Sequence, residues 1–296
     1  MRTAGVKIWT LEYKNTKDNF LKQAKNQAKG EENHIYLAEQ PGSLSQALDI
    51  GGERLSEKIS LCRKRNIPYV ISLVGAGGKT TVMYQMAKEL AGEGWKVAVT
   101  TSTHIFIPEE GIPVLFLPEE KNFEKRIEEA EIKAEEEKNF LVSGVICIQT
   151  EGENKKLSSL PEELFGRLEG WADILLIEAD GSKHLPLKIP APWEPVILPE
   201  TSLVIGCVGL SSLGKPWREI CFRSEYGHRF FVGDVVTEES VAGILTDEQA
   251  MKKSVGTREY RIVLNQADSQ EDRKKGEKIL RMTQGICDGG ICTSFL

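Results

Sequence analysis

The sequence predicts an α/β protein of three layers, in which a mostly parallel sheet lies between two layers of helices. Short apolar runs rich in β-branched residues recur along the chain, and each has the character of a buried strand. Segments with apolar residues at helical spacing separate these runs. Strands that alternate with helices favour a parallel sheet covered on both faces. The balance of 40% hydrophobic and 28% charged residues is ordinary for a globular chain.

The expected elements follow in chain order. Strands are expected at residues 69–74, 96–101, 114–117, 141–148, 172–177, 203–208 and 260–264. Helices are expected at residues 43–48 with Ser43 as N-cap, 54–64, 80–90, 119–138 and 237–253. The helix within 119–138 is heavily charged, so we expect it on the surface.

Composition argues against several classes of function. The net charge of -6 gives no basic field for nucleic acid. The sequence has no uncharged apolar run of about 18 residues, so we expect no membrane span. The cysteines are scattered rather than arranged as a disulfide framework, and the cytoplasm is the expected compartment.

A glycine-rich loop between a strand and its helix predicts a phosphate-binding site. The loop consists of Gly75, Ala76, Gly77, Gly78, Lys79, Thr80 and Thr81. Backbone N–H groups at a helix start attract an anion, and glycines let the backbone wrap closely around it. In such a P-loop, Lys79 reaches the β- and γ-phosphates and the Thr80 hydroxyl ligates Mg²⁺. We therefore expect a P-loop NTPase-like fold with ATP or GTP and Mg²⁺ as cofactors.

The loop departs from the commonest P-loop pattern. That pattern, G-x-x-x-x-G-K-[ST], puts its first glycine at position 73, which is Leu73 here. The shorter G-x-x-G-K-T-T form resembles the loop of Mur-type amide ligases and folylpolyglutamate synthases. The other interpretation is a glycine-rich turn whose lysine has no role in binding.

The chain is expected to contain one such domain. Residues 43–296 form the P-loop nucleotide-binding α/β domain, and residues 1–42 form an N-terminal extension. Within the extension, the Lys- and Asn-rich stretch 15–29 predicts a short amphipathic helix. After about residue 285 we expect a short, partly ordered tail, in which Cys287 and Cys292 are incidental thiols.

Two acidic residues follow the strand expected at 172–177. Glu178 and Asp180 would lie at the same edge of a parallel sheet as the glycine-rich loop. There a carboxylate holds Mg²⁺, directly or through water, or orients an attacking water. We expect Glu178 on the metal side and Asp180 as its catalytic partner, and the reverse order stays open. The alternative is a solvated strand end with a turn-forming Asp-Gly.

A threonine-rich segment ends the strand expected at 96–101. Thr101 and Thr103 would place hydroxyls near the γ-phosphate at the same edge of the sheet. His104 would act there as an acid, a base or a metal ligand. A turn histidine without a catalytic role is an equal alternative.

Residues 265–268 predict a nucleobase site, a helix start, or both. The sequence Asn265-Gln266-Ala267-Asp268 resembles the N-K-x-D element of GTPases, in which the Asp accepts from the guanine ring. Gln266 replaces the lysine, so the pattern does not choose between ATP and GTP. Asn265 and Asp268 are candidates for contact with the base. Asp268 is also expected to N-cap the helix that continues towards Leu280.

Five blocks of sequence occur in a fixed order along the chain. They are ISLVGAGGKTT at 71–81, TTSTHI at 100–105, EADGSKHLPLK at 178–188, VGLSSLGKP at 208–216 and NQAD at 265–268. This series resembles the YqeC family, the accessory proteins of selenium-dependent molybdenum hydroxylases. The sequence departs from the family pattern at Gln266, where lysine is expected, and at Phe222, where histidine is expected.

The resemblance implies an accessory factor in the maturation of selenium-dependent molybdenum hydroxylases. The implied partner is a molybdenum hydroxylase or one of its cofactor-handling proteins. The resemblance also adds Lys188, Glu194 and Lys215 as candidate site residues. The alternative for residues 186–199 is a Pro-rich loop over the sheet edge.

Three functions are compatible with these patterns. The leading one is a slow NTPase whose hydrolysis gates the transfer or insertion of a cofactor or selenium species into a partner enzyme. The second is an ATP-dependent ligase or kinase that acts on a small molecule, as the Mur-like loop indicates. The third is a nucleotide-sensing scaffold without hydrolysis.

Overall fold

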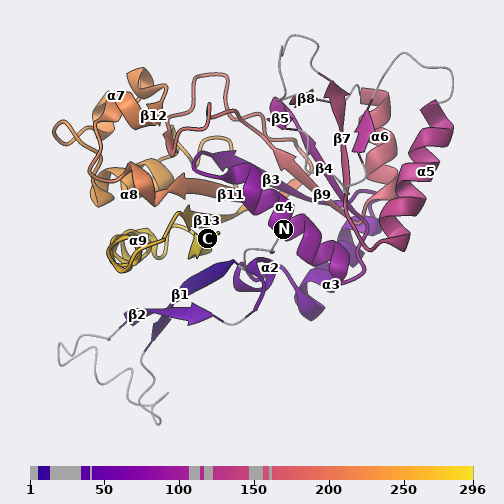
Figure 1. Cartoon of the computed structure of the whole chain (residues 1–296), viewed down its shortest axis with the longest axis horizontal. Coiled ribbons are helices and arrows are strands. Elements are labelled where there is room, and N and C mark those ends of the chain that lie inside the picture. The colour runs from indigo at the N-terminus through magenta and orange to yellow at the C-terminus, as the bar shows by residue number, and fades with distance from the viewer. Residues whose placement is uncertain are drawn as a thin grey trace.

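The computed structural model describes residues 6–13, 35–40, 42–106, 114–116, 123–146, 156–159 and 162–295. A mostly parallel sheet lies at its centre, with helices on both faces (Figure 1). The α/β class and the parallel sheet expected from the sequence are confirmed. Among the described residues, none of the helices has the length and apolar character needed to cross a membrane.

Twelve strands of the described chain form the large sheet. They are β1 (Lys7–Tyr13), β2 (Ile35–Gln40), β3 (Tyr69–Gly75), β4 (Val97–Thr101), β5 (His104–Phe106), β6 (Val114–Phe116), β7 (Leu141–Ile146), β8 (Lys156–Ser158), β9 (Ile174–Glu178), β11 (Thr201–Gly209), β13 (Glu259–Asn265) and β14 (Gly289–Ser294). Their order is β2-β1-β14-β13-β11-β3-β9-β4-β7-β8-β5, and β6 pairs with β7. The run from β14 to β7 is parallel, whereas β1 and β8 are antiparallel to their neighbours.

The seven strands predicted from apolar runs are all present as β3, β4, β6, β7, β9, β11 and β13. The structure adds β2, β1 and β14 at one side of the sheet, β8 and β5 at the other side, and a separate ribbon of β10 (Leu187–Lys188) and β12 (Cys221–Phe222). The expectation of a partly ordered tail is wrong for residues 289–294. These residues form the strand β14, which pairs with both β13 and β1 and buries Ile291 and Cys292. The two glycines at its start are unusual within a strand, so the sequence pattern did not predict one.

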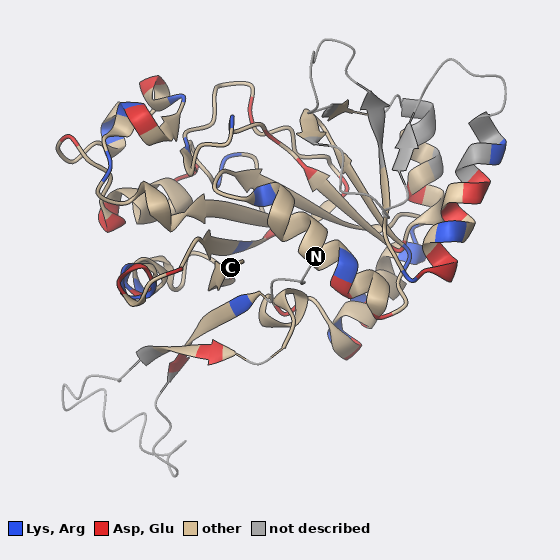
Figure 2. Ribbon diagram, in the orientation of Figure 1, with Lys and Arg blue, Asp and Glu red and all other residues tan. Residues whose placement is uncertain are grey.

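Eight α-helices surround the sheet within the described residues. They are α2 (Leu44–Ala47), α3 (Gly52–Arg63), α4 (Lys79–Gly92), α5 (Phe123–Glu136), α6 (Glu162–Trp171), α8 (Glu238–Thr246) and α9 (Gln270–Thr283), and the single turn α7 (Trp217–Ile220) follows β11. Two of them, α2 and α7, have only four residues each. Ser43 caps α2 as predicted, because its hydroxyl accepts the Gln46 N–H. Figure 2 shows acidic and basic segments interspersed along α5, the charged helix expected from the sequence.

Alternating residues of β3 show how the layers pack. Leu73 belongs to a core shared with α2, α3 and α4 on one face of the sheet. Val70 packs towards α5 and α6, and Val74 packs towards α8 and α9, on the other face. Side chains on a strand alternate between its two faces, so one buried strand joins both helical layers.

Two sequence expectations differ from the structure or fall outside it. Asp268 is not the N-cap of α9. Ser269 caps that helix through a capping box, in which its hydroxyl accepts the Asp272 N–H at 3.0 Å and the Asp272 carboxylate accepts the Ser269 N–H at 3.0 Å. The helix expected at 15–29 lies outside the described residues. The boundary at residue 42 stays a prediction, and β1 and β2 precede it.

The connections of the central strands place a crevice beside β3. From β3 the chain passes through α4 to β4, on the β9 side of the sheet. From β11, which neighbours β3, the chain passes through α8 to β13, in the opposite direction. Ligands of open α/β sheets bind where neighbouring connections diverge, beyond the carboxyl ends of the strands. The loops after β3 and β11 meet at this point.

Candidate functional site

We call residues 75–81, at the junction of β3 and α4, the phosphate loop, after the role predicted for them. Gly75, Gly77 and Gly78 have φ of 96°, 72° and 107°, which favour glycine. A Cβ on Gly77 would lie 2.1 Å from the Gly209 nitrogen, and one on Gly78 would lie 2.3 Å from Asn265 Nδ2. The glycines are therefore needed both for the backbone turn and for its close contact with the last residues of β11 and β13.

Three N–H groups of the phosphate loop donate to acceptors inside the protein. They are Gly75 N–H to both Asp180 carboxylate oxygens at 3.1 Å, Ala76 N–H to the Cys207 carbonyl at 2.9 Å and Gly77 N–H to the Leu185 carbonyl at 3.2 Å. The first hydrogen bond of α4 is from Val82 N–H to the Gly78 carbonyl at 3.0 Å. Helix geometry gives the N–H groups of Lys79, Thr80 and Thr81 no acceptor within α4, and Gly78 supplies no side-chain cap.

Lys79 lies inside this arrangement, with 3% of its surface exposed. Its Nζ is 2.6 Å from the Gly75 carbonyl, 3.2 Å from Asp180 Oδ1 and 3.8 Å from Glu178 Oε1. Burial alone would lower the pKa of Lys79, but the carboxylates of Asp180 and Glu178 outweigh it and raise that pKa. The ammonium group therefore stays charged at the start of α4.

Thr80 and Glu178, the two residues predicted to hold Mg²⁺, are in direct contact. The Thr80 hydroxyl donates to Glu178 Oε2 at 2.6 Å. Mg²⁺ keeps its oxygen ligands at about 2.0–2.1 Å in octahedral geometry, which places adjacent ligand oxygens about 3 Å apart. The two oxygens therefore fit neighbouring positions on one ion after a shift of a few tenths of an ångström. Burial raises the pKa of Glu178, and Lys79 and Thr80 oppose that rise.

A chain of ion pairs leads from the phosphate loop towards the surface. Asp180 Oδ2 is 3.0 Å from Lys188 Nζ, which is also 2.7 Å from Glu194 Oε2. Glu194 is in turn 2.5 Å from Arg223 Nη1. The structure thus joins Lys188 and Glu194 to Asp180, whereas Lys215 is exposed in the loop before α7. In this series of ion pairs, the contact between Glu194 and Arg223 was not predicted from the sequence motifs.

The threonine-rich segment lies beside the acidic strand end. Thr101 Oγ1 donates to the Glu178 carbonyl at 3.0 Å and accepts the Thr103 N–H at 2.9 Å. These contacts fix the end of β4 against the end of β9. His104 is exposed on β5, where it pairs across the strands with Ser158.

Asn265 holds the phosphate loop from the other side. Its Nδ2 donates to the Gly77 carbonyl at 3.0 Å, and its Oδ1 accepts from Gln266 N–H at 2.8 Å and Thr293 Oγ1 at 3.1 Å. The Asn265 side chain is thus engaged within the protein. Asp268 is exposed and accepts from Ser294 Oγ at 2.7 Å. A contact of either residue with a nucleobase stays a prediction.

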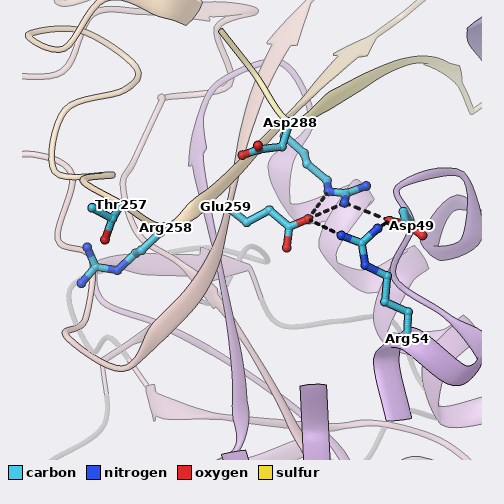
Figure 3. Close-up of a pocket in the computed structure, with 7 residues that line it drawn as sticks. Asp49, Arg54, Thr257, Arg258, Glu259 and Asp288 are labelled. Atoms are coloured by element: carbon cyan, nitrogen blue, oxygen red, sulfur yellow. Dashed lines mark hydrogen bonds and ion pairs between the residues drawn. The ribbon is translucent and has the colours of Figure 1, made fainter. Parts of the chain in front are cut away.

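A separate hollow of about 430 Å³ lies at the opposite edge of the sheet, where β13 begins (Figure 3). Four of its charged groups pair with one another: Arg261 Nη2 is 3.2 Å from Asp49 Oδ2, and Arg54 and Arg261 both pair with Glu259. These pairs tie α3 and the end of α2 to β13. Arg258 instead donates to backbone carbonyls, and Asp288 accepts the Tyr260 N–H. We regard the hollow as a structural network, because each of these groups already has a partner within the fold.

Comparison with known proteins places the chain in a family. The model of the YqeC protein family matches residues 71–225, which is just over half of the chain and includes the phosphate loop, Glu178, Asp180 and Arg223. The chain is also similar to the Uncharacterized protein YqeC of Escherichia coli (strain K12), with 33% identity over 148 residues, which are 50% of this chain and 54% of that protein. It therefore spans about half the length of this curated relative. On the extent of the family match, the chain belongs to the YqeC family.

Proposed function

We propose that this protein binds a nucleoside triphosphate with Mg²⁺ at the phosphate loop and hydrolyses it slowly. The observation that carries the proposal is the convergence of a buried ammonium group, a hydroxyl and a carboxylate at the uncapped start of α4. The Glu178 carboxylate joins them, since it lies 3.8 Å from Lys79 Nζ and accepts from the Thr80 hydroxyl at 2.6 Å. This donor set matches what a phosphate chain and its metal need.

Each residue has a distinct part in the proposed site. The N–H groups of the first turn of α4 would hold phosphate oxygens, and Lys79 would exchange the Gly75 carbonyl for the β- and γ-phosphates. Thr80 and Glu178 would hold Mg²⁺, which supplies charge neutralisation at the phosphates. Asp180 would orient the attacking water. Lys188 would keep Asp180 in place, because its Nζ is 3.0 Å from Asp180 Oδ2.

We further propose that hydrolysis gates the transfer or insertion of a cofactor or selenium species into a molybdenum hydroxylase. The family resemblance motivates this role, and the phosphate loop gives it an energy source. The expected behaviour is weak basal turnover that changes when a client hydroxylase or a cofactor-handling protein is added. Turnover unaffected by any such protein would contradict the gating role while leaving the nucleotide site intact.

Calorimetric titration tests the nucleotide site directly. ATP, GTP and their non-hydrolysable analogues would be titrated with and without Mg²⁺. We expect wild-type protein to bind at least one triphosphate and Lys79→Ala to lose that binding, because the substitution removes the buried ammonium group that contacts the Gly75 carbonyl, Asp180 and Glu178. Lys88→Ala is the matched control, since Lys88 is exposed on the same helix. Lack of binding by the wild type would overturn the proposal.

The phosphate loop is shorter than the commonest P-loop pattern and resembles that of Mur-type ligases. This likeness supports a second candidate, an ATP-dependent ligase or kinase acting on a small molecule. This candidate requires a phosphorylated or acyl-phosphate product. A screen of carboxylate and cofactor acceptors with ATP and Mg²⁺ would detect it. A nucleotide-dependent product that Lys79→Ala fails to make would place this function ahead of the first.

A further inference from the structure

The segment between β9 and β10 lies across the phosphate loop. We call residues 181–186 the strap. Its Leu185 carbonyl accepts the Gly77 N–H at 3.2 Å, and its Pro186 carbonyl accepts the Gly209 N–H at 2.8 Å. A Cβ on Gly77 would lie 2.8 Å from the Pro186 oxygen, so strap and loop are in direct contact.

The strap and a bound triphosphate compete for the same donor. A backbone N–H makes one well-aligned hydrogen bond at a time. Phosphate-binding loops turn successive N–H groups towards the anion, and the Gly77 N–H instead points at the Leu185 carbonyl. The partial negative charge of that carbonyl also repels phosphoryl oxygens. The contact between strap and loop therefore has to break for the Gly77 N–H to join the N–H groups of α4 in holding phosphate.

The strap is held in an unfavourable backbone conformation. Lys183 and His184 have φ of 49° and 63°, although neither is glycine, and both are exposed. The strained residues form a tight turn. Leu185 N–H donates to the Ser182 carbonyl at 3.1 Å, which closes the turn around Lys183 and His184, and Lys188 Nζ donates to the Gly181 carbonyl at 2.6 Å. Opening of this turn would let the Leu185 and Pro186 carbonyls withdraw without unfolding the strands on either side.

We propose that the strap is an autoinhibitory element, which closes the phosphate loop in the free protein and lifts when a triphosphate binds. This inference rests on the proposed function, because it requires a nucleotide at the loop. It assigns regulation of that site to the turn at Lys183 and His184, in which the Lys183 Nζ lies 5.3 Å from the centre of the Phe222 ring.

Two double variants test the strap, and we expect them to change the affinity for nucleotide in opposite directions. Lys183→Gly with His184→Gly relieves the left-handed strain and stabilises the closed strap. Lys183→Val with His184→Val increases the strain, because β-branched residues avoid positive φ. We expect the glycine variant to bind a non-hydrolysable ATP or GTP analogue with Mg²⁺ roughly fivefold more weakly than wild type, and the valine variant roughly fivefold more tightly. Both variants remove the Lys183 and His184 side chains. The effect of losing their contacts is therefore the same in both, and a difference in affinity between the two variants reports the backbone strain.

A control and a second readout separate the possible outcomes. Ser254→Val places the same strain at φ 64° in the turn before β13, and it should leave affinity unchanged. Hydrogen exchange of the Gly209 amide should become faster when the analogue binds wild type, because the Pro186 carbonyl withdraws. Equal affinities for both variants and unchanged exchange would overturn the strap and leave the nucleotide site standing. Absence of binding in the wild type and in both variants would overturn the proposed function as well.

Discussion

At the scale of single residues, the site depends on a buried carboxylate. Burial raises the pKa of Glu178, although Lys79 and Thr80 act against the rise. A carboxyl group whose pKa is higher in the folded than in the unfolded state holds its proton more tightly when folded. The free energy of unfolding therefore falls as pH rises from the unfolded pKa to the folded pKa, and the cost stays constant above it.

Glu178→Gln should consequently stabilise the free protein at pH 8. We expect a gain in Tm on the order of 2 °C, which shrinks towards pH 4 because the wild-type carboxyl is protonated there. Thermal melts from pH 4 to 8 measure this dependence. Glu57→Gln, at an exposed position of α3, serves as the control with no pH-dependent gain. A loss of stability at pH 8 would show that the charge of Glu178 is fully compensated in the fold.

The positions of Lys79, Thr80, Glu178 and Asp180 were predictable because parallel strands end at one edge of a sheet. Lys79 and Thr80 begin the helix that follows β3, whereas Glu178 ends β9 and Asp180 follows it by two residues. The link from Lys188 to Arg223 was not predictable in the same way, since it joins β10 to the segment after β12 through Glu194. No period or spacing in the sequence encodes that contact.

At the scale of elements, the glycines before and at the end of α4 differ in whether a larger residue could replace them. Gly77 precedes the helix with φ 72° and has no room for a Cβ, whereas Gly92 ends the helix with nothing within 4 Å of an added Cβ. Gly77→Ala should lower the free energy of unfolding by about 2–4 kcal/mol and weaken nucleotide binding. Gly92→Ala should raise it by up to about 1 kcal/mol, because alanine favours the helix. Denaturant titration of both variants compares them, and equal effects would contradict the tight packing of the phosphate loop.

The apolar runs predicted the central strands well, because a strand buried on both faces needs hydrophobic residues at every position. Apolar runs did not predict strands that are short or rich in glycine and that are held mainly by pairing with neighbouring strands. β14 begins with two glycines, and β5 and β8 are each only three residues long. The strap was also beyond the reach of sequence patterns. Its Leu185 and Pro186 contacts are made by backbone carbonyls, which every residue carries.

At the scale of the whole molecule, the sheet depends on a strand that the sequence suggested was a loose tail. Ile291 on β14 is 1% exposed and packs in the core with β1 and α4, whereas Ile286 just before it is 48% exposed. Ile291→Ala should cost about 2–5 kcal/mol of unfolding free energy, and Ile286→Ala less than about 1 kcal/mol. Chemical denaturation measures both. Similar small losses would indicate that β14 contributes little to the fold.

The pairing of β1 with β14 also sets the order of events during synthesis. Residues 7–13 leave the ribosome long before residues 289–294, which supply their neighbour in the sheet. At 5–20 residues per second the delay is on the order of tens of seconds. Throughout that interval the side of β1 that pairs with β14 has unpaired backbone N–H and C=O groups, next to Ile8 and Trp9, which are buried in the finished molecule. A strand made early is thus completed late, so a holdase that shields this side of β1 should improve the yield of native protein.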